Sequence, residues 1–395
     1  MPGSSPDAAR TAAFLTRNAV DCLPDSGLVE RLSEGRELRV KLGMDPTAAD
    51  VHLGHTVVLQ KLREFQDAGH TVVLIIGDYT ARVGDPSGRS STRPLLSGEE
   101  IDANARTYVD QAAKVLRADS RLEVRHNSEW LDMRTDALFG LVRHVTVAQI
   151  LEREDFARRW AAREPVSLLE LLYPVLQGYD SVAVRADVEL GGTDQKFNLL
   201  MGRAIQTAYG QPPQVVLTVP LLVGTDGARK MSKSLGNHVG VTDPGPEMYG
   251  RVLSLPDTAL AGWYDLLLGA APEAQLGPRD AKRALARTLA DRFVGPGAGE
   301  AAQAEFDRVF RARGVPTEIE EATIACAGGT AHLPEVIVAA FGGSRSEARR
   351  SLAAGAVRLD GSVVPAEALD VPCADLEGVV LQVGKRRFRR LRLAH

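Results

Sequence analysis

Cysteine, long apolar runs and a secretion signal are scarce or missing in this sequence. Its 395 residues include only three cysteines, and no C-x-x-C pair occurs among Cys22, Cys326 and Cys373. Neither a disulfide framework nor a structural zinc site is therefore expected. No apolar run reaches the roughly 18 residues that a membrane-spanning helix needs, and the N-terminal residues lack the basic start and apolar stretch of a signal peptide. We expect a cytoplasmic protein without a membrane or a protein-bound metal.

A strong net charge is also absent. The total is −4, which argues against a protein that coats nucleic acid along its whole length. The charge is unevenly spread, however, because residues 345–395 carry ten Lys or Arg against six Asp or Glu. The C-terminal segment is thus the expected polyanion-binding part.

The chain exceeds the size at which one hydrophobic core usually stops growing, so two or three domains are expected. LRVKLG (38–43) is typical of a buried strand, and residues 56–69 place Val58, Leu62 and Phe65 at helical spacing. TVVLIIGD (71–78) is typical of a strand buried on both faces of a parallel sheet. The three segments predict a β-α-β unit of an open α/β sheet, whose ligands bind beyond the carboxyl ends of the strands.

We predict an α/β fold in four parts. A Rossmann-like catalytic domain covers 1–223, with a helical insertion at about 97–165, and a loop and linker covers 224–245. A helical domain follows over 246–326, where Leu, Ala and Arg recur at helical spacing. The last part, 333–395, alternates one helix with short strands and is expected to be a small α+β domain.

Two loops carry residue types that suit a nucleotide. HLGH (52–55) places His52 and His55 beside a helix N-terminus, where free backbone N–H groups attract phosphate, and Gly54 leaves room for a flat ring. KMSKS (230–234) offers Lys230 and Lys233 to a departing pyrophosphate. Either segment alone also fits an ordinary surface loop. Together and in this order they resemble the two signatures of class I aminoacyl-tRNA synthetases.

Three further segments resemble bacterial-type tyrosyl-tRNA synthetases. YPVLQGYD (173–180) places Tyr173, Gln177 and Asp180 on one helical face; a core-facing helix would show the same spacing. The resemblance implies that Tyr173 and Gln177 hold the substrate α-amino group and that Asp180 accepts the phenolic hydroxyl. GGTDQ (191–195) and GDPSGRSSTR (84–93) complete the likeness.

The resemblance implies a set of site residues for each step. The expected catalytic residues are His52, His55, Lys230, Lys233, Arg89 and Arg93. ATP is expected to contact Thr47, His52, Gly54, His55, Gly192, Asp194, Lys230, Met231, Ser232, Lys233 and Ser234. Tyrosine is expected to contact Asp45, Asp85, Tyr173, Gln177, Asp180 and Gln195.

Lys41 departs from the family pattern, because many tyrosyl enzymes have a tyrosine four residues before the Asp of DPT. We expect Lys41 either to turn away from the pocket or to modulate the charge of Asp180. Arg89 stands where the family often has lysine, which keeps the charge but changes its shape.

The resemblance further implies the partners. The enzyme would activate L-tyrosine with ATP, accompanied by Mg²⁺, and transfer it to tRNA(Tyr) as a tyrosine–tRNA ligase. The C-terminal domain (333–395), with SRSEARRSLAAGAVRLDG (344–361) at its centre, resembles the S4 RNA-binding fold and has Arg345, Arg349 and Arg350 on one helical face. The resemblance also implies that the helical domain (246–326) is of the anticodon-binding type. A homodimer is expected. Another H-x-G-H adenylyltransferase, an RNA-binding protein without activity and the tryptophanyl relative remain as alternatives.

Overall fold

The computed structural model describes residues 6–46, 50–85, 97–310, 319–326, 329–384 and 387–394. The chain forms two compact units, residues 1–296 and 297–395. The boundaries of the four parts expected above remain predictions. Among the described residues, no helix is both long and apolar enough to cross a membrane.

The first unit is built on a six-stranded sheet of order β1-β6-β5-β2-β3-β4. All neighbouring strands are parallel except β1, which pairs antiparallel with β6 at one edge. Apolar side chains fill the central strands; in β3 all but the first residue are buried. The strands are β1 (Asp21–Leu23), β2 (Arg39–Met44), β3 (Thr71–Ile76), β4 (Leu122–His126), β5 (Val188–Gly192) and β6 (Val215–Val219).

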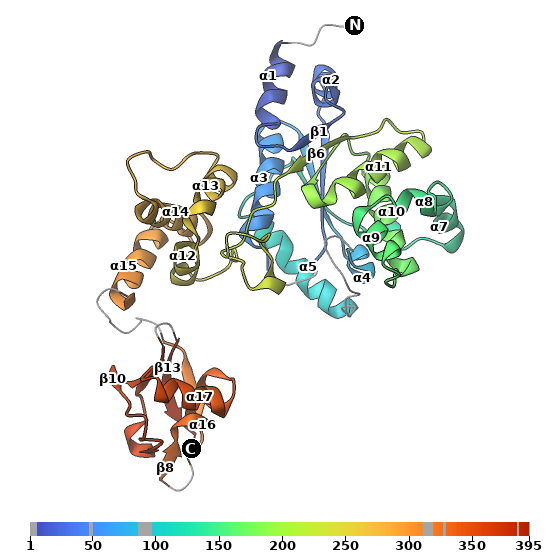
Figure 1. The fold of residues 1–395 in the computed structure, drawn as a ribbon. Helices are drawn as coiled ribbons and strands as arrows, with labels where there is room; N and C mark the ends of the chain where they lie inside the picture. Colours follow the sequence, from blue (N-terminus) through green and yellow to red (C-terminus); the bar gives the residue numbers. More distant parts are fainter. Residues whose placement is uncertain are drawn as a thin grey trace. The chain divides into compact units, whose positions relative to one another are not determined.

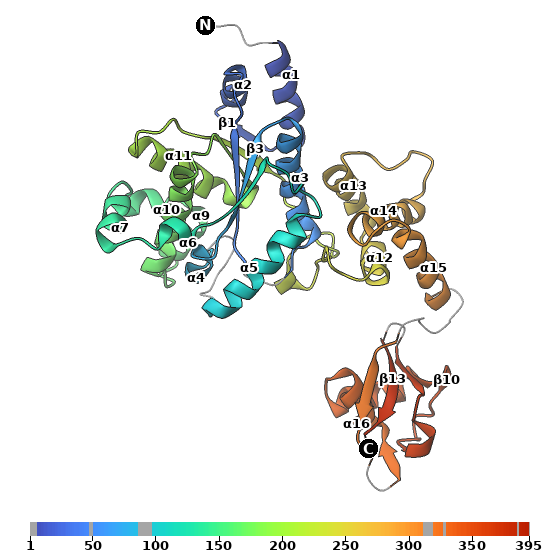
Figure 2. The ribbon, with the colours of Figure 1, turned by 180° about the vertical axis from the view of Figure 1, so that it is seen from behind.

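Helices cover both faces of this sheet, with α3 on one face and α10 and α11 on the other (Figures 1 and 2). This layering explains why the central strands are mostly apolar. The helices as far as β6 are α1 (Pro6–Leu15), α2 (Gly27–Ser33), α3 (Leu53–Asp67), α4 (Thr80–Val83), α5 (Gly98–Ala112), α6 (Ser128–Leu131), α7 (Thr135–Val142), α8 (Val147–Ile150), α9 (Glu154–Ala161), α10 (Leu168–Ala183), the 3₁₀ turn η1 (Thr193–Gln195) and α11 (Lys196–Ala208).

The predicted β-α-β unit is confirmed as β2, α3 and β3. The predicted insertion at 97–165 is mainly helical, but it also contains β4, which pairs in parallel with β3 and belongs to the sheet. This strand was missed because its five residues are all half-buried and show no continuous apolar run. The capping box predicted at the start of α10 is present: Ser167 Oγ accepts a hydrogen bond from Leu169 N, and the Glu170 carboxylate accepts one from Ser167 N.

A group of helices follows the sheet within the same unit: α12 (Gly245–Leu253), α13 (Leu260–Leu268) and α14 (Pro278–Phe293), with the 3₁₀ turns η2 (Lys233–Leu235) and η3 (Asp257–Ala259). α12 packs on α14, and α13 contacts α3. Trp263 is fully buried, and its indole N–H donates to the carbonyl of Val223, 3.0 Å away. The end of the sheet is thereby tied to the helices that follow the KMSKS segment.

The second unit joins α15 (Ala298–Phe310) to a small α+β fold. Its five-stranded sheet has the order β10-β9-β12-β13-β7, and a separate pair is formed by β11 and β8. Leu333, Leu352, Leu381 and Leu391 lie in its buried core. The elements are β7 (Glu321–Ile324), β8 (Thr330–His332), α16 (Leu333–Phe341), α17 (Arg345–Ala353), β9 (Val357–Leu359), β10 (Ser362–Val363), β11 (Asp370–Pro372), the 3₁₀ turn η4 (Cys373–Asp375), β12 (Val380–Val383) and β13 (Arg387–Leu393).

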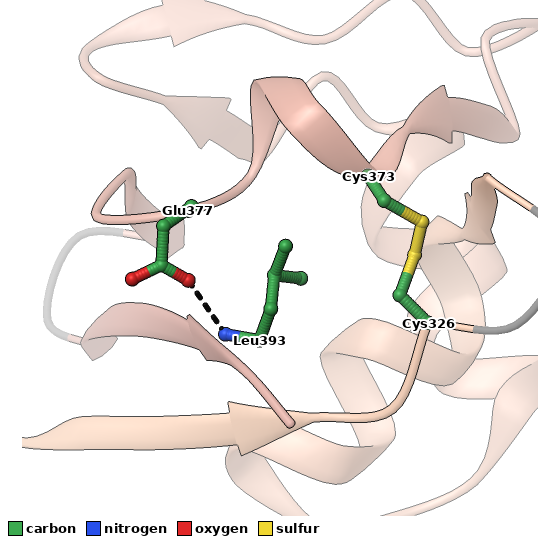
Figure 3. The surroundings of a disulfide bond; sticks show 4 residues. All are labelled: Cys326, Cys373, Glu377 and Leu393. Carbon is green, nitrogen blue, oxygen red and sulfur yellow. Dashed lines mark hydrogen bonds between the residues drawn. A yellow bond between two sulfur atoms is a disulfide. The ribbon is translucent and has the colours of Figure 1, made fainter. Parts of the chain in front are cut away.

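A disulfide joins Cys326, after β7, to Cys373 at the start of η4 (Figure 3). The two Cα atoms are 6.2 Å apart, within the usual range for a disulfide. The prediction that no disulfide forms is therefore wrong. The two cysteines are 47 residues apart in sequence, and their approach depends on how the unit folds, which spacing alone does not reveal.

Candidate active site

A cavity of about 320 Å³ opens at the carboxyl ends of β2, β3, β5 and β6. This is the edge of the sheet at which a ligand site was predicted. Fourteen of the predicted site residues line it: Asp45, His52, Gly54, His55, Asp85, Tyr173, Gln177, Asp180, Gly192, Asp194, Gln195, Lys230, Met231 and Ser232. Lys233 and Ser234 lie outside the lining, and Thr47, Arg89 and Arg93 lie outside the described residues.

The two histidines of HLGH lie at the N-terminus of α3, as predicted. His52 is the N-cap residue, its ring stacks on that of His55 at 3.8 Å, and its backbone N–H donates to Nδ1 of His55. Burial, followed by neighbouring histidine rings and Lys233, lowers the pKa of His52 to about 2. Burial and Lys233 lower the pKa of His55 to about 4. Both rings are neutral at pH 7, and Nδ1 of His55 already accepts a bond, so its Nε2 carries the proton and can donate to a phosphate oxygen.

Both lysines of the KMSKS segment are paired with carboxylates. Lys230 Nζ lies 2.7 Å from Asp194, and Lys233 forms an ion pair with Asp50. Between them Met231 is buried, and its sulfur accepts a hydrogen bond from Gly54 N. The two signature loops are therefore in direct contact.

Asn237, which the sequence reading did not single out, holds the KMSKS segment in shape. Its side chain is 3% exposed. The amide oxygen accepts from Ser232 N at 2.8 Å, and the amide nitrogen donates to the carbonyl of Lys230 at 3.2 Å and to Asp226 at 3.0 Å. One buried amide thus joins Lys230 to Ser232, and it fixes the backbone on either side of Met231.

The resemblance to class I synthetases assigns this segment to adenylate formation, so we expect Asn237→Asp to slow that step about tenfold while the KM for tyrosine stays unchanged. The new carboxylate cannot donate to the Lys230 carbonyl and would face Asp226, so the segment loses its shape but the amino-acid pocket does not. Single-turnover adenylate formation with separate titrations of ATP and tyrosine would measure this. A change confined to the tyrosine KM would contradict it.

The Tyr173, Gln177 and Asp180 face of α10 points into the cavity, as predicted. The Tyr173 hydroxyl donates to Asp45 at 2.9 Å, and Asp45 also accepts from Thr80 at 2.7 Å. A Cβ at Gly77 would come within 2.0 Å of the Asp45 carboxylate, so only glycine leaves this carboxylate in place.

Asp180 has partners that were not predicted. Its carboxylate accepts from the indole N–H of Trp130 at 2.8 Å and from the side-chain amide of Asn127 at 3.4 Å. Asn127 directly follows β4, so recognising that strand would have placed it at the same sheet edge. No comparable signal in the sequence indicates Trp130.

Burial raises the pKa of two carboxyls that line this cavity, Asp45 and Asp180. Burial, and then the charges of Asp85 and Asp180, raise the pKa of Asp45 to about 7 despite its hydrogen bond from Thr80. Burial raises the pKa of Asp180 to about 6, while the charge of Lys41 opposes the shift. Excess negative charge in an apolar setting is suited to a ligand that brings a positive group.

These pKa values predict a pH dependence. The raised carboxyls contribute stability below pH 4, and this contribution is lost as the pH rises through 6 to 7. An ammonium ligand needs them ionised, so its affinity should increase over the same interval, by about tenfold between pH 5.5 and 8. Calorimetry of tyrosine binding in buffers of different ionisation enthalpy should detect released protons, and Asp45→Asn should flatten the profile. Affinity that is constant with pH would contradict the assignment.

Lys41 turns away from the cavity. Its ammonium is fully buried and lies 2.8 Å from Glu189, which is 1% exposed. Both expectations for this residue hold, because Lys41 lies outside the cavity lining and its charge still lowers the pKa of Asp180. Asp85, at the far side of the cavity, accepts from the Gln195 amide at 2.8 Å.

Comparison with known proteins identifies the family. The model described as class I tRNA synthetases (W and Y) matches residues 33–311. The chain is 47% identical to a tyrosine–tRNA ligase of Moorella thermoacetica, covering 98% of this chain and 96% of the relative. It is 46% identical to that of Bordetella pertussis, covering 98% of each, and 47% identical to that of Thermotoga maritima, covering 96% of each.

Solved structures share the fold. The crystal structure of a tyrosyl-tRNA synthetase from Archaeoglobus fulgidus, in complex with L-tyrosine, has a TM-score of 0.62 at 23% identity and covers 75% of this chain and 99% of its own. That of Aeropyrum pernix has a TM-score of 0.61 at 20% identity, with 75% and 98% covered. The sequence matches and the paired HLGH and KMSKS loops agree: the chain belongs to the class I tRNA synthetases of the tryptophanyl and tyrosyl family.

Proposed function

We propose that this protein is a tyrosine–tRNA ligase, which forms tyrosyl-adenylate from ATP and L-tyrosine and then charges tRNA(Tyr). The observation that carries the proposal is that one cavity joins the HLGH and KMSKS loops to the face formed by Tyr173, Gln177 and Asp180. The full-length relatives named tyrosine–tRNA ligase support the same activity.

Catalysis in this cavity rests on positioning and charge. The tyrosine carboxylate is already ionised, so it attacks the α-phosphorus of ATP without a general base. Charge then develops on the departing pyrophosphate, where the neutral His52 and His55 donate hydrogen bonds and the two KMSKS lysines supply positive charge. Mg²⁺ arrives with the triphosphate as part of the substrate.

The lysines must exchange partners during this step. Lys230 and Lys233 lie against Asp194 and Asp50, and the family resemblance implies that Asp194 contacts the ribose of ATP. When the ribose hydroxyls bind to Asp194, Lys230 is released toward the phosphates. The pairs are partly exposed, so breaking them costs about 1 kcal/mol or less.

Transfer to tRNA is assigned to the helical part of the first unit and to the second unit. Arg345, Arg349 and Arg350 on α17 are all exposed, and a positive face of this kind positions an RNA backbone. We propose a cytoplasmic location for this role.

We propose a homodimer because large apolar side chains are exposed on α7, α8, α9 and the start of α10, and these helices pack together. Phe139 is 65% exposed, Trp160 66% and Leu168 80%. Exposed apolar groups of this size, collected on neighbouring elements, mark an interface between proteins.

We therefore expect Trp160→Asp/Leu168→Asp to convert a dimer into a monomer, since burying two unpaired carboxylates in an interface costs several kcal/mol. Sedimentation velocity would measure the shift, and Leu235→Asp, at another exposed leucine, serves as a control. A wild-type protein that sediments as a monomer would refute the dimer.

Tyrosine-dependent ATP–pyrophosphate exchange tests the activity. Exchange with tyrosine, and much less with tryptophan or phenylalanine, is expected. Exchange with tryptophan alone would assign the protein to the tryptophanyl branch. No exchange with any amino acid, together with retained RNA affinity, would support an RNA-binding protein without this activity.

A further inference from the structure

A buried ion pair lies directly behind the amino-acid pocket. Lys41 on β2 and Glu189 on β5 are 0% and 1% exposed, and their charged atoms are 2.8 Å apart. Neither residue lines the cavity. Burying two charges is expensive, and a neutral apolar pair of similar volume is often at least as stable. Stability alone is therefore a weak reason for this pair.

The ammonium of Lys41 and the carboxylate of Glu189 have further hydrogen-bond partners, most of them on α10. The Lys41 ammonium has three N–H groups, and besides Glu189 it donates to the carbonyl of Gln177 at 3.0 Å and to Ser181 Oγ at 2.9 Å. Glu189 in turn accepts from Ser181 Oγ at 3.1 Å, from the Gln214 amide and from the Gln177 amide nitrogen at 3.4 Å. Both charges therefore act on the turn of α10 that carries Gln177.

The other side of the Gln177 amide is held by a second chain of bonds. Arg153, which has only donors, gives a bond to the Asn198 oxygen at 3.0 Å. The Asn198 nitrogen must then face the other way, and it donates to the Gln177 oxygen at 3.0 Å and to the Gln195 oxygen at 3.0 Å. A donor-only cation stands at one end of this relay, and an acceptor-only carboxylate stands at the other.

We propose that the Lys41–Glu189 pair is a positioning device that fixes the orientation of the Gln177 amide. Because Glu189 can only accept, it holds the Gln177 nitrogen, and the Gln177 oxygen is left facing the cavity with a free lone pair. That oxygen accepts a hydrogen bond from the ammonium group of the amino-acid substrate. A neutral amide at position 189 could pair with either end of Gln177, so the orientation would rest on the Arg153–Asn198 relay alone and would be held less firmly. The inference rests on the proposed function, since it assigns an ammonium ligand to this pocket.

The test is to remove both charges and to measure which functional group of the ligand then contributes less to the affinity. Lys41→Met/Glu189→Gln keeps similar volumes without leaving a single buried charge. Three ligands are compared by calorimetry: tyrosine, tyramine, which keeps the ammonium but lacks the carboxylate, and 3-(4-hydroxyphenyl)propionate, which lacks the ammonium. We expect affinity for tyrosine and tyramine to fall about tenfold, since a charged hydrogen bond is lost, and affinity for the third ligand to change less than twofold.

The comparison separates this role from others. Loss of the Lys41 charge also alters Asp180, but all three ligands carry the phenol, so that effect cancels between them. Equal losses for all three ligands, or no loss for any, would overturn the proposal. If the unchanged protein bound neither tyrosine nor tyramine, the proposed function would fail instead.

A second buried pair supplies a matched control. Lys61 and Glu64 on α3 are 2.6 Å apart, with side chains 5% and 9% exposed, and neither residue lines the cavity. Lys61→Met/Glu64→Gln should leave the affinities for all three ligands unchanged. If circular dichroism shows that the first variant does not fold, Lys41→Met/Glu189→Met takes its place with the same expected pattern.

Discussion

A Lys230→Ala variant is expected to form the aminoacyl-adenylate about 10² to 10³ times more slowly than the unchanged protein, with little effect on the KM for tyrosine. A positive group aimed at charge that develops only in the transition state contributes to the rate and not to ground-state binding. Lys230 lies beside Asp194 at the ATP end of the cavity, away from the α10 face assigned to tyrosine. Stability should barely change, because its ion pair is partly exposed.

Stopped-flow or rapid-quench measurement of a single turnover would give the adenylation rate directly. Lys196→Ala is the matched control, since Lys196 is 43% exposed against 41% for Lys230 and is likewise paired, with Asp21. Lys196 does not line the cavity, so this variant should keep the full rate. An unchanged rate in Lys230→Ala would remove the KMSKS segment from the proposed mechanism.

Local pattern was sufficient to predict the β-α-β unit and the place of the HLGH segment at a helix N-terminus. The β-branched run of β3 and the helical spacing in α3 depend on neighbours in sequence, so they could be read without a structure. The same holds for His52, which lies at the N-cap because the apolar periodicity of α3 begins just after it.

Partners brought together by the fold could not be predicted. Glu189 stands in the apolar segment VELGG, and its sequence neighbours do not indicate that it pairs with Lys41. Lys41 lies 148 positions earlier, on the adjacent strand. Trp130 reaches Asp180 only because α6 follows β4 at the edge of the sheet. The Cys326–Cys373 disulfide was missed for the same reason.

The roles of all the site residues remain predictions, and for three of them no contacts can be described. Thr47, Arg89 and Arg93 lie outside the described residues, so their assignment to ATP and pyrophosphate depends on the family resemblance alone. The six residues proposed to contact tyrosine, in contrast, all lie within the described residues, so the specificity for tyrosine can be argued from their contacts.

An Asp180→Ala variant is expected to lose most of the preference for tyrosine over phenylalanine, with the ratio of the two kcat/KM values falling by about 10² or more. Asp180 is 3% exposed and has donors from Trp130 and Asn127 on one side. A phenolic hydroxyl supplies a further donor, whereas phenylalanine would leave a desolvated carboxylate short of one. Such an unmet charged group costs about 1–3 kcal/mol or more, and the cost vanishes when the carboxylate is removed.

Because the prediction concerns a ratio, a general loss of activity or stability cancels from it. Asp78→Ala tests this point, since Asp78 is a buried carboxylate at the same sheet edge, 8% exposed, that accepts bonds from Ser128 and does not line the cavity. It should reduce the stability of the protein and leave the tyrosine-to-phenylalanine ratio in pyrophosphate exchange unchanged. If Asp180→Ala also kept the ratio, Asp180 would not be the acceptor of the phenol. Lys41 cannot supply that acceptor, since its ammonium has only donors and lies behind the pocket with Glu189.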